Sequence, residues 1–483
     1  MRFAFSAQEL PAMAADLLIV GVPAGGLAAA LATLDAAYGG ALTTLAADDE
    51  FSGKSGSSLG TPGLGRIAAK KLLLIGVGAG GLADIRTASG TAGFQSRTRG
   101  AKNVVIAFPG AALGAVEIRA VAEAFAEGNY RFDKYKSAAS KKAAAESLTF
   151  AGVTEDKDAV ARATALISGQ NLARDLVNEP ASEIYPESLA NIAASLASER
   201  ISVTVLDEVA IAEKGMGGIT GVGQGSDRKP RFVHMTYTPA GPAKGHICFV
   251  GKGVTFDSGG LSIKPTDGMM TMRCDMAGSA AVIGAMKAIA ALQPNVKVTG
   301  IFGAVENMLS GNSYKLGDLL KMYNGKRVEI NNTDAEGRLV LGDCLSYASD
   351  LKPDAIVDLA TLTGAAVIAL GDWYNVLYSR SDELAATLTT HAHASGEGIW
   401  RLPLAEIYKD KIKSEWGDLK NSGGRVAGSI TAALFLSEFV TVEKWAHIDI
   451  AGPAFMDSSF LHFAQGGTGT MVRTLARWAE SYG

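Results

Sequence analysis

Short apolar runs rich in β-branched residues recur along the first 150 residues, and each ends at a glycine or proline. Three runs, residues 17–23, 71–78 and 103–110, are apolar at almost every position. Strands buried on both faces of a parallel sheet show this pattern. An alanine-rich helical pattern follows the third run over residues 111–128. We therefore predict an N-terminal α/β domain with a mostly parallel sheet.

A polar stretch over residues 130–147 separates this part from the rest of the chain. A long helical pattern starts near Asp156 and stops before Pro180, which cannot continue a helix. Strand and helix patterns then alternate at residues 200–207, 231–237, 246–253, 279–292 and 337–351. We predict two domains, 1–160 and 161–483, the second a larger α/β domain with a central mixed sheet flanked by helices.

Composition narrows the function classes. The chain has 483 residues, and its formal net charge of −4 argues against a protein built mainly to hold nucleic acid or an anionic membrane. Its cysteines, Cys248, Cys274 and Cys344, match no zinc-ribbon or disulfide spacing, which fits a reducing compartment. The sequence shows no signal-peptide core and no apolar run of the roughly 18 to 20 residues that a membrane helix needs. We expect a cytoplasmic protein without a membrane partner.

A glycine pattern after residues 71–75 resembles a dinucleotide fingerprint. Gly76, Gly78 and Gly81 have the G-x-G-x-x-G spacing. The fingerprint also requires a helix there and an acidic residue about 20 positions later. Glycine, serine and threonine interrupt the helical pattern that follows, and the next strand ends without an acid. We interpret the glycines as a tight turn; a nicotinamide oxidoreductase is the alternative that cofactor binding would test.

The chemistry-bearing segment runs from Gly251 to Arg338. It contains the charged residues Lys252, Asp257, Lys264, Asp275, Asp334, Glu336 and Arg338, several beside glycine and in apolar surroundings. Four carboxylates that converge in a water-poor pocket repel one another unless they are protonated or bind cations. Two divalent cations would neutralise them, and paired metals are a common device for hydrolysis. Histidine is absent from this segment, which disfavours a histidine-based zinc site.

Taken singly, each of these residues also has an ordinary structural interpretation. Asp257 in a TFDSGG turn could be a turn or cap residue. Asp334 and Glu336 could form a capping box for the helix that follows. Asp275 could pair with Arg273, and Lys264 and Arg338 could be solvated surface charges. The single residues therefore leave both interpretations open.

Whole strings of sequence are more specific. GKGVTFDSGG, SIKP, MRCDMAGSAAV and NTDAEGRLVL, in this order, resemble the leucine (cytosol) aminopeptidase family of dinuclear metallopeptidases. The likeness covers most of residues 165–475, and it includes NLARDLVNEPA, DLATLTGAAVIALG and WAHIDIAGPA. The first 150 residues resemble the family's variable, macro-like domain in α/β character only.

The resemblance implies a metal-dependent aminopeptidase that releases N-terminal residues, preferably leucine or other apolar residues, from peptides. It implies a site for two metal ions (Mn²⁺ or Zn²⁺, with Mg²⁺ or Co²⁺ as alternatives) held by Lys252, Asp257, Asp275, Asp334 and Glu336. It implies catalytic roles for Lys264, which stabilises the oxyanion after attack by a metal-activated hydroxide, and for Arg338, which holds a bicarbonate as general base. Lys252 would have to be neutral to ligate a metal; an ammonium paired with the carboxylates is the alternative.

The resemblance also implies substrate contacts and assembly. Peptide substrate would touch Lys252, Asp257, Lys264, Asp275 and Asp334, and the first side chain would enter an apolar pocket of Met272, Thr361, Gly364, Ala451 and Ala454. The assembly implied is a homo-hexamer, a dimer of trimers built partly by the N-terminal domain. Some bacterial members also bind DNA in transcription or recombination. The short basic runs 96–102 and 130–136 are weak support for DNA binding by this chain.

Overall fold

The computed structural model describes residues 1–482 of the chain. It forms two compact units, Met1–Ile167 with Ser458–Gln465, and Ser168–Asp457 with the segment from Gly466 onward. Helix α5 (Lys157–Asn178) contains the division between the units. A short segment close to the C-terminus therefore belongs to the N-terminal unit.

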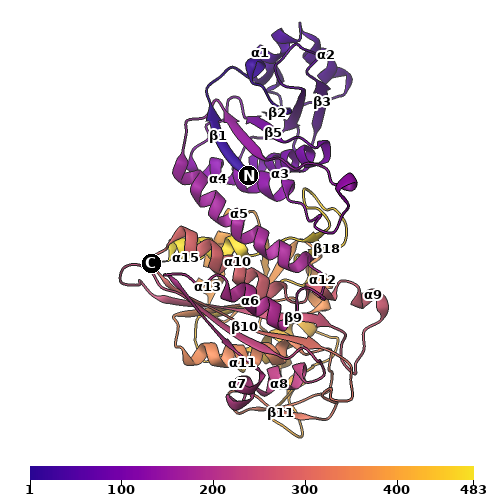
Figure 1. Cartoon of the computed structure of the whole chain (residues 1–483), viewed down its shortest axis with the longest axis vertical. Helices are drawn as coiled ribbons and strands as arrows, with labels where there is room; N and C mark the ends of the chain where they lie inside the picture. Colours follow the sequence, from indigo (N-terminus) through magenta and orange to yellow (C-terminus); the bar gives the residue numbers. More distant parts are fainter. Residues whose placement is uncertain (483) are drawn as a thin grey trace. The chain divides into compact units, whose positions relative to one another are not determined.

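The N-terminal unit is built on a six-stranded sheet in the order β1-β6-β5-β2-β4-β3 (Figure 1). All neighbouring strands are parallel except β3 and β4. The strands are β1 (Arg2–Ser6), β2 (Leu17–Val22), β3 (Ser58–Pro62), β4 (Lys71–Gly76), β5 (Asn103–Ala107) and β6 (Ser147–Ala151). The mostly parallel sheet predicted from the apolar runs is confirmed.

Helices cover both faces of this sheet: α1 (Leu27–Ala37), α2 (Ala41–Asp48), α3 (Leu82–Arg99) and α4 (Ala115–Asn129). Alternation along β2 divides its side chains between two cores. Leu17 and Ile19 pack with α3 and α4, whereas Leu18 and Val20 pack with α1 and α2. Because both faces are covered, the strand has no polar position, which explains its uninterrupted apolar run.

The expectation that the helical pattern fails after Gly81 is wrong, because α3 begins at Leu82 and continues for 18 residues. The glycines that weaken the pattern are packing contacts between helices. A Cβ at Gly93 would lie 2.0 Å from the carbonyl oxygen of Phe125, and one at Gly128 would lie 2.1 Å from that of Gly90. Glycine lets the backbones of α3 and α4 approach closely, at a cost in helix propensity.

The larger unit contains an eight-stranded mixed sheet in the order β15-β14-β17-β13-β9-β10-β8-β7. Its strands are β7 (Ile201–Leu206), β8 (Arg231–Tyr237), β9 (His246–Asp257), β10 (Lys297–Asn307), β13 (Ala355–Ala360), β14 (Tyr374–Ser379), β15 (Gly398–Arg401) and β17 (Trp445–Asp449). The four central strands β10, β9, β13 and β17 are parallel to one another. Small sheets lie beside it: β11 (Leu319–Lys321), β12 (Arg327–Glu329) and β16 (Leu419–Lys420), and β18 (Phe455–Met456) with β19 (Gly466–Gly467).

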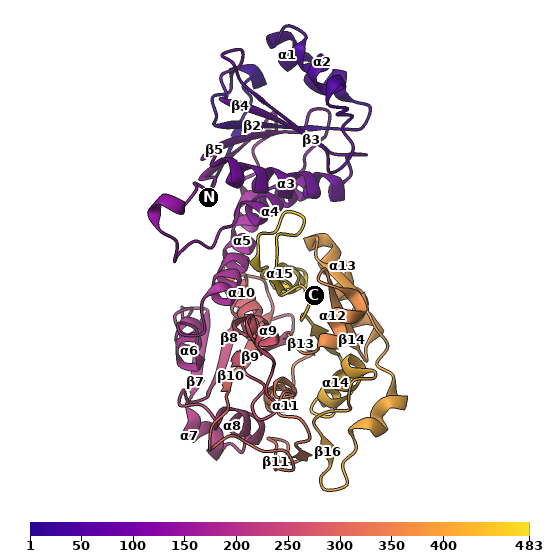
Figure 2. The same cartoon turned by 90° about the vertical axis from the view of Figure 1, so that its right-hand side faces the viewer.

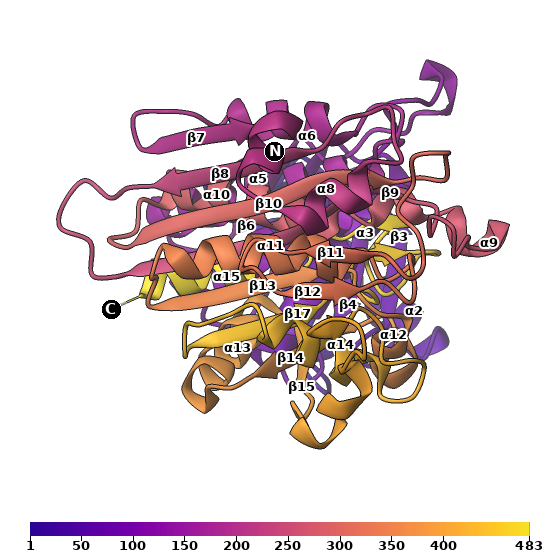
Figure 3. The same cartoon turned by 90° about the horizontal axis from the view of Figure 1, so that it is seen from below.

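Helices lie on both faces of the large sheet (Figures 2 and 3). The helices of this unit are α6 (Pro186–Ala194), α7 (Glu208–Glu213), α8 (Gly217–Gly223), α9 (Thr266–Met269), α10 (Ala277–Leu292), α11 (Gly337–Asp350), α12 (Gly364–Leu370), α13 (Asp382–Ser395), α14 (Gly428–Ser437) and α15 (Val472–Ser481). Cys248 and Val250 of β9 share a buried core with α8, α11 and α14, while Phe249 meets Trp478 of α15. The two-domain α/β architecture is thus confirmed.

One stretch differs from what the apolar runs predict. The helical region Thr266–Leu292 has the length and composition of a membrane-crossing helix, although 78% of its apolar window is buried inside the protein. Residues 277–286 of α10, for example, are all buried. The apolar character is accounted for by packing inside the unit. All three cysteines are free and buried.

Candidate metal centre

The candidate site lies where four parallel strands end at the same edge of the large sheet. Asp257 is the last residue of β9, and Asn307 the last of β10. Thr361 directly follows β13, and Asp449 ends β17. Ligand sites of α/β sheets lie at such carboxyl ends. Strand β9 runs through Asp257 rather than ending near Gly253, so Lys252 lies inside the strand.

Lys252 lies in the innermost part of the site between two acids. Its Nζ is 2.8 Å from Asp275 Oδ1 and 2.8 Å from Glu336 Oε1, and it donates to the Thr361 carbonyl at 2.9 Å. The side chains of all three charged residues are at most 5% exposed. A Cβ at Gly337 would lie 2.4 Å from Lys252 Cε, so the glycine after Glu336 makes room for the lysine. The glycine of the NTDAEGR string is therefore explained by the close packing of Lys252 against it.

Lys264 occupies a similar place between the other two acids. Its Nζ is 2.9 Å from Asp257 Oδ2 and 2.5 Å from Asp334 Oδ1. Lys264 and Asp334 are more accessible, with side chains 17% and 34% exposed, whereas Asp257 is 3% exposed. Lys264 follows the turn at Gly259 and Gly260, whose φ angles of +85° and +62° favour glycine. The turn brings Lys264 back toward the strand end that carries Asp257.

Hydrogen bonds fix the orientation of the acids. Asp257 Oδ1 accepts from the Gly259 amide at 2.8 Å and from Asn307 Nδ2 at 2.8 Å. Thr361 Oγ1 donates to Asp275 Oδ1 at 2.8 Å. One oxygen of Asp257 therefore closes the turn, as its turn interpretation predicts, and the other oxygen faces Lys264.

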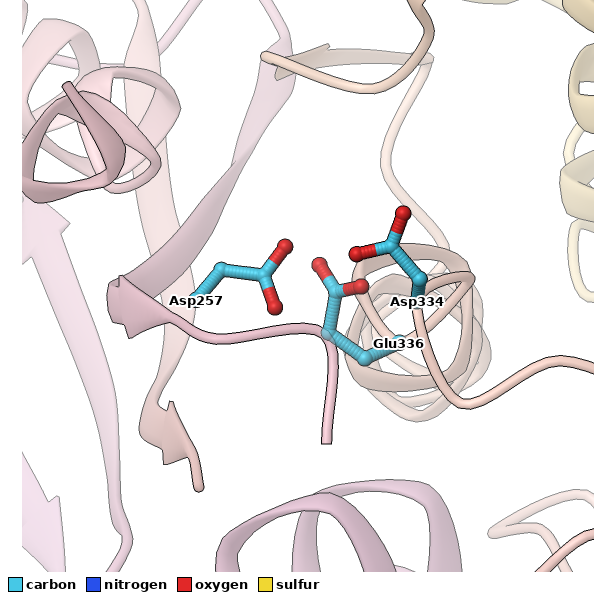
Figure 4. Close-up of side chains that lie close together, drawn as sticks. All are labelled: Asp257, Asp334 and Glu336. Atoms are coloured by element: carbon cyan, nitrogen blue, oxygen red, sulfur yellow. The ribbon is translucent and has the colours of Figure 1, made fainter. Parts of the chain in front are cut away.

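Three carboxylates point toward one another (Figure 4). Asp257, Asp334 and Glu336 each offer an oxygen within 4.8 Å of the others. Asp275 lies beside them through Lys252 and is not a member of that triplet. Four carboxyl groups stand against two lysines in the cluster, so its acids outnumber its lysines.

The electrostatics of the site favour cations. Burial raises the pKa of Asp275 well above its usual value, and the nearby Glu336 and Asp257 raise it further. Burial lowers the pKa of Lys252, but the charges of Asp275 and Glu336 outweigh this, so its pKa is raised. The pKa of Lys264 is raised in the same way by Asp257 and Glu336 against the effect of burial. Without metal, both lysines are ammonium groups.

The donor set suits divalent metal ions. Asp275 Oδ2 is buried without a hydrogen-bond partner, and Asp334 Oδ1 and Glu336 Oε1 meet a lysine ammonium without hydrogen-bond geometry. Oxygen atoms of this kind are the ligands preferred by Mg²⁺ and Mn²⁺, and Zn²⁺ also accepts them. The residues present therefore fit a pair of metal ions.

The structure decides against two of the ordinary interpretations. Helix α11 begins at Gly337 with Glu336 in the N-cap position, and Glu336 makes no side-chain capping bond. Asp275 pairs with Lys252, whereas the Arg273 guanidinium lies over the ring of Phe455. Among the described residues, α11 therefore has no capping box of Asp334 and Glu336, and Asp275 forms no ion pair with Arg273.

Arg338 is buried rather than solvated, with 8% of its surface exposed. Its Nη1 donates to the Asn421 carbonyl at 2.8 Å, and its Nε is buried without a hydrogen-bond partner. Burial lowers its pKa to about 10, so it carries its charge at neutral pH. An unpartnered buried N–H on a cation is a suitable donor for a small anion.

The residues expected to form the apolar pocket are distributed around the site. Thr361 contacts Asp275, and Gly364 begins α12 and lines a cavity of about 310 Å³ that also contains Asp334 and Arg338. Met272, Ala451 and Ala454 are not among the residues that line this cavity, and Ala454 is 1% exposed. Their joint role as a pocket stays a prediction.

Sequence reasoning did not single out Asn307 and Asn421, both fully buried. Asn421 Nδ2 donates to the Asn332 carbonyl at 2.6 Å, and its Oδ1 accepts from the Asn331 amide at 3.0 Å. The only sequence signal was an asparagine within a string typical of the family. Its partner lies 90 positions away, which local patterns do not reveal.

Comparisons with known proteins agree with this geometry. Residues 171–476 match the model of the cytosol aminopeptidase family, catalytic domain, and residues 19–139 match that of the same family's N-terminal domain. A probable cytosol aminopeptidase of Nostoc punctiforme is 42% identical over 482 residues, covering 97% of each chain. One from Aquifex aeolicus is 44% identical over 435 residues, covering 88% of this chain and 87% of that protein.

Solved structures show the same similarity. A tomato leucine aminopeptidase mutant superposes with a TM-score of 0.90 at 33% identity, covering 99% of this chain and 96% of that one. The bottromycin maturation enzyme BotP in complex with Mn gives a TM-score of 0.85 at 34% identity, with 97% and 99% covered.

Proposed function

Because this chain belongs to the cytosol aminopeptidase family, we propose that it is a leucyl aminopeptidase, releasing leucine and other apolar residues from the N-termini of peptides in the cytoplasm. The family is one of metal-dependent aminopeptidases. The single observation that carries the proposal is the convergence of Asp257, Asp275, Asp334 and Glu336 with Lys252 and Lys264 at one edge of the sheet.

Metal binding would use the acidic cluster. Asp257, Asp334 and Glu336 would hold one ion, and Lys252 and Asp275 would complete the site of the second. Two such ions, Mn²⁺ or Zn²⁺ with Mg²⁺ or Co²⁺ as alternatives, polarise the scissile carbonyl and lower the pKa of water when they are bound. The free α-amine of the peptide would bind at this metal site, which would restrict cleavage to the amino end of the chain.

Lys264 is the residue placed to stabilise the transition state. It is the more exposed of the two lysines, and its ammonium reaches Asp257 and Asp334 from the open side of the cluster. A donor there strengthens its interaction as negative charge develops on the carbonyl oxygen of the substrate. Lys264 therefore stabilises the oxyanion.

Arg338 is the residue suited to hold a bicarbonate ion. Its unpartnered Nε is buried near Glu336, and Asn421 fixes the other side of the guanidinium. A bicarbonate bound there supplies a base for the attacking water. This assignment accounts for a hydrolytic site in which no histidine lies in the segment 251–338.

Substrate preference and assembly complete the proposal. The first side chain of the peptide enters an apolar pocket of Met272, Thr361, Gly364, Ala451 and Ala454, where the small Ala454 leaves room for leucine or methionine. The functional assembly is a homo-hexamer, a dimer of trimers, which admits peptides and unfolded chain ends.

One experiment tests the function. The purified protein is assayed on a panel of aminoacyl-anilides before and after chelation, with Mn²⁺, Zn²⁺, Mg²⁺ or Co²⁺ restored singly. We expect leucyl-anilide to be among the best substrates, chelation to abolish hydrolysis and at least one metal to restore it. Acetyl-leucyl-anilide, which lacks the free amine, is the control and should not be cleaved. Hydrolysis that survives full chelation, or cleavage of the acetylated control, would contradict the proposal.

A further inference from the structure

A second arginine lines the cavity beside the metal centre. The cavity of about 310 Å³ is lined by Asp334 and Arg338 on its charged side, by Leu362 and Ile368 as apolar groups, and by Arg425. Ile368 is 86% exposed, so its wall is open to solvent. The charged residues lining the cavity are thus Asp334, Arg338 and Arg425.

Arg425 differs from Arg338 in what it contacts. Arg338 is buried and donates to the Asn421 carbonyl. Arg425 is exposed, and within residues 1–482 its guanidinium makes no hydrogen bond or ion pair. An arginine that lines a cavity without an internal partner retains all five of its N–H donors for a ligand.

The loop that carries Arg425 is tied to the loop that carries Asp334. Asn331 Nδ2 donates to the Ser422 carbonyl at 2.9 Å, and the Ser422 amide donates to Asn331 Oδ1 at 2.9 Å. Asn421 adds the bond from its Nδ2 to the Asn332 carbonyl. These hydrogen bonds join the two loops at points close in sequence to both side chains. Asn421 lies four positions before Arg425, and Asn331 lies three positions before Asp334. The loop ends at Ala427, which has a φ of +58° and directly precedes α14.

We propose that Arg425 binds the free carboxylate of the second residue of a dipeptide, so that dipeptides are preferred over substrates without a carboxylate there. A dipeptide has an ammonium at one end and a carboxylate one residue beyond the scissile carbonyl. In the proposed function the amino end of the substrate binds at the acidic cluster, and Asp334 of that cluster lines the same cavity as Arg425. Guanidinium and carboxylate form two parallel hydrogen bonds, which an amide or a further peptide bond cannot reproduce. The inference rests on the proposed aminopeptidase function.

The test compares two substrates that differ only in the terminal charge. Values of kcat/KM are measured for Leu-Gly and for Leu-Gly-amide with the metal-loaded protein and with Arg425→Gln. We expect the native protein to favour Leu-Gly by roughly tenfold and the ratio to fall to about one in Arg425→Gln, mainly through KM. Arg425→Lys should keep only part of the preference, because lysine retains the charge but not the paired donors.

Arg327→Gln is the matched control, since Arg327 is exposed on β12 and does not line the cavity. It should leave the Leu-Gly to Leu-Gly-amide ratio as in the native protein. A native ratio near one, a ratio unchanged in Arg425→Gln, or the same fall in Arg327→Gln would overturn the inference while the aminopeptidase function stands. Absence of hydrolysis of both substrates by the native protein would instead refute the proposed function. Leu-Gly-amide turnover in the same sample shows that each variant is folded.

Discussion

The two lysines of the metal centre have matching partners but different surroundings. Lys252 lies between Asp275 and Glu336 with 4% of its side chain exposed, while Lys264 lies between Asp257 and Asp334 with 17% exposed. Lys252 also donates to a backbone carbonyl, and a glycine next to Glu336 is needed to fit it. The first lysine is therefore part of the interior, and the second lies at the open side.

This difference assigns different tasks to residues of the same type. A buried ion pair is costly to break, because the remaining charge has no water to solvate it. A partly exposed pair is weaker, and its members are free to exchange partners when a substrate arrives. We infer that Lys252 belongs to the metal-binding framework and that Lys264 interacts with the reacting peptide.

The largest loss of activity is expected from Glu336, which contacts both the inner and the outer part of the acidic cluster. Glu336 contacts Lys252 on one side and faces Asp257 and Asp334 on the other. Glu336→Ala should reduce leucyl-anilide hydrolysis to background while the far-ultraviolet circular dichroism stays native. Glu213→Ala, an exposed glutamate at the end of α7, is the control and should keep full activity. A fully active Glu336→Ala protein would contradict the site assignment.

Lys264→Ala should lower kcat for the hydrolysis of leucyl-anilide. Loss of an oxyanion donor costs about 10²- to 10³-fold in kcat, because the interaction forms in the transition state rather than in the bound substrate. KM should change little. Steady-state kinetics on leucyl-anilide separate the two parameters, and a variant with raised KM at native kcat would show that Lys264 only binds substrate.

The stability of the metal-free protein should depend on the inner lysine. Lys252→Met leaves Asp275 and Glu336 buried without a counter-charge, which costs about 3–5 kcal/mol of unfolding free energy. Lys264→Met should cost less than this, because Asp334, one of its two partners, is 34% exposed and its charge is screened by water. Urea unfolding in the presence of chelator measures both variants. Equal losses would show that burial does not distinguish the two lysines.

A smaller effect is expected at the loop connection. Asn421→Ala removes the donor to Asn332 and the acceptor for the Asn331 amide, and buried groups left unpaired cost about 1–3 kcal/mol. Ser422→Ala, whose hydroxyl contacts only the Gly424 amide in the described chain, should change stability by less than about 0.5 kcal/mol. The urea midpoints of the two variants check this order.

Much of the fold could be predicted from local patterns. The uninterrupted apolar run of β2 indicated a strand buried on both faces, and both faces are covered by helices. Helix α3 was missed because Gly90 and Gly93 weaken its propensity. A side chain at Gly93 would meet the backbone of α4, and one at Gly90 would meet the ring of His462, and the sequence of one helix does not record these tertiary contacts.

The acids and lysines of the site were identified as a set because each lies in a distinctive string. Their supporting residues were not, because the contacts join distant segments. Asn307 meets Asp257 across 50 positions, and Asn421 meets Asn331 across 90. The segment Ser458–Gln465 likewise joins the N-terminal unit, where His462 lies 2.8 Å from Glu127. Hydrophobic periodicity predicts which face of a segment is buried, but it does not predict which distant segment packs against that face.

The central claim is that this acidic cluster binds two metal ions per chain. The most direct test is to load the protein with Mn²⁺, remove unbound ions by dialysis and measure metal per chain by mass spectrometry. The account predicts about two ions for the native protein and at most one for Glu336→Ala. A native protein that retains no metal, or a Glu336→Ala protein that retains two, would contradict it.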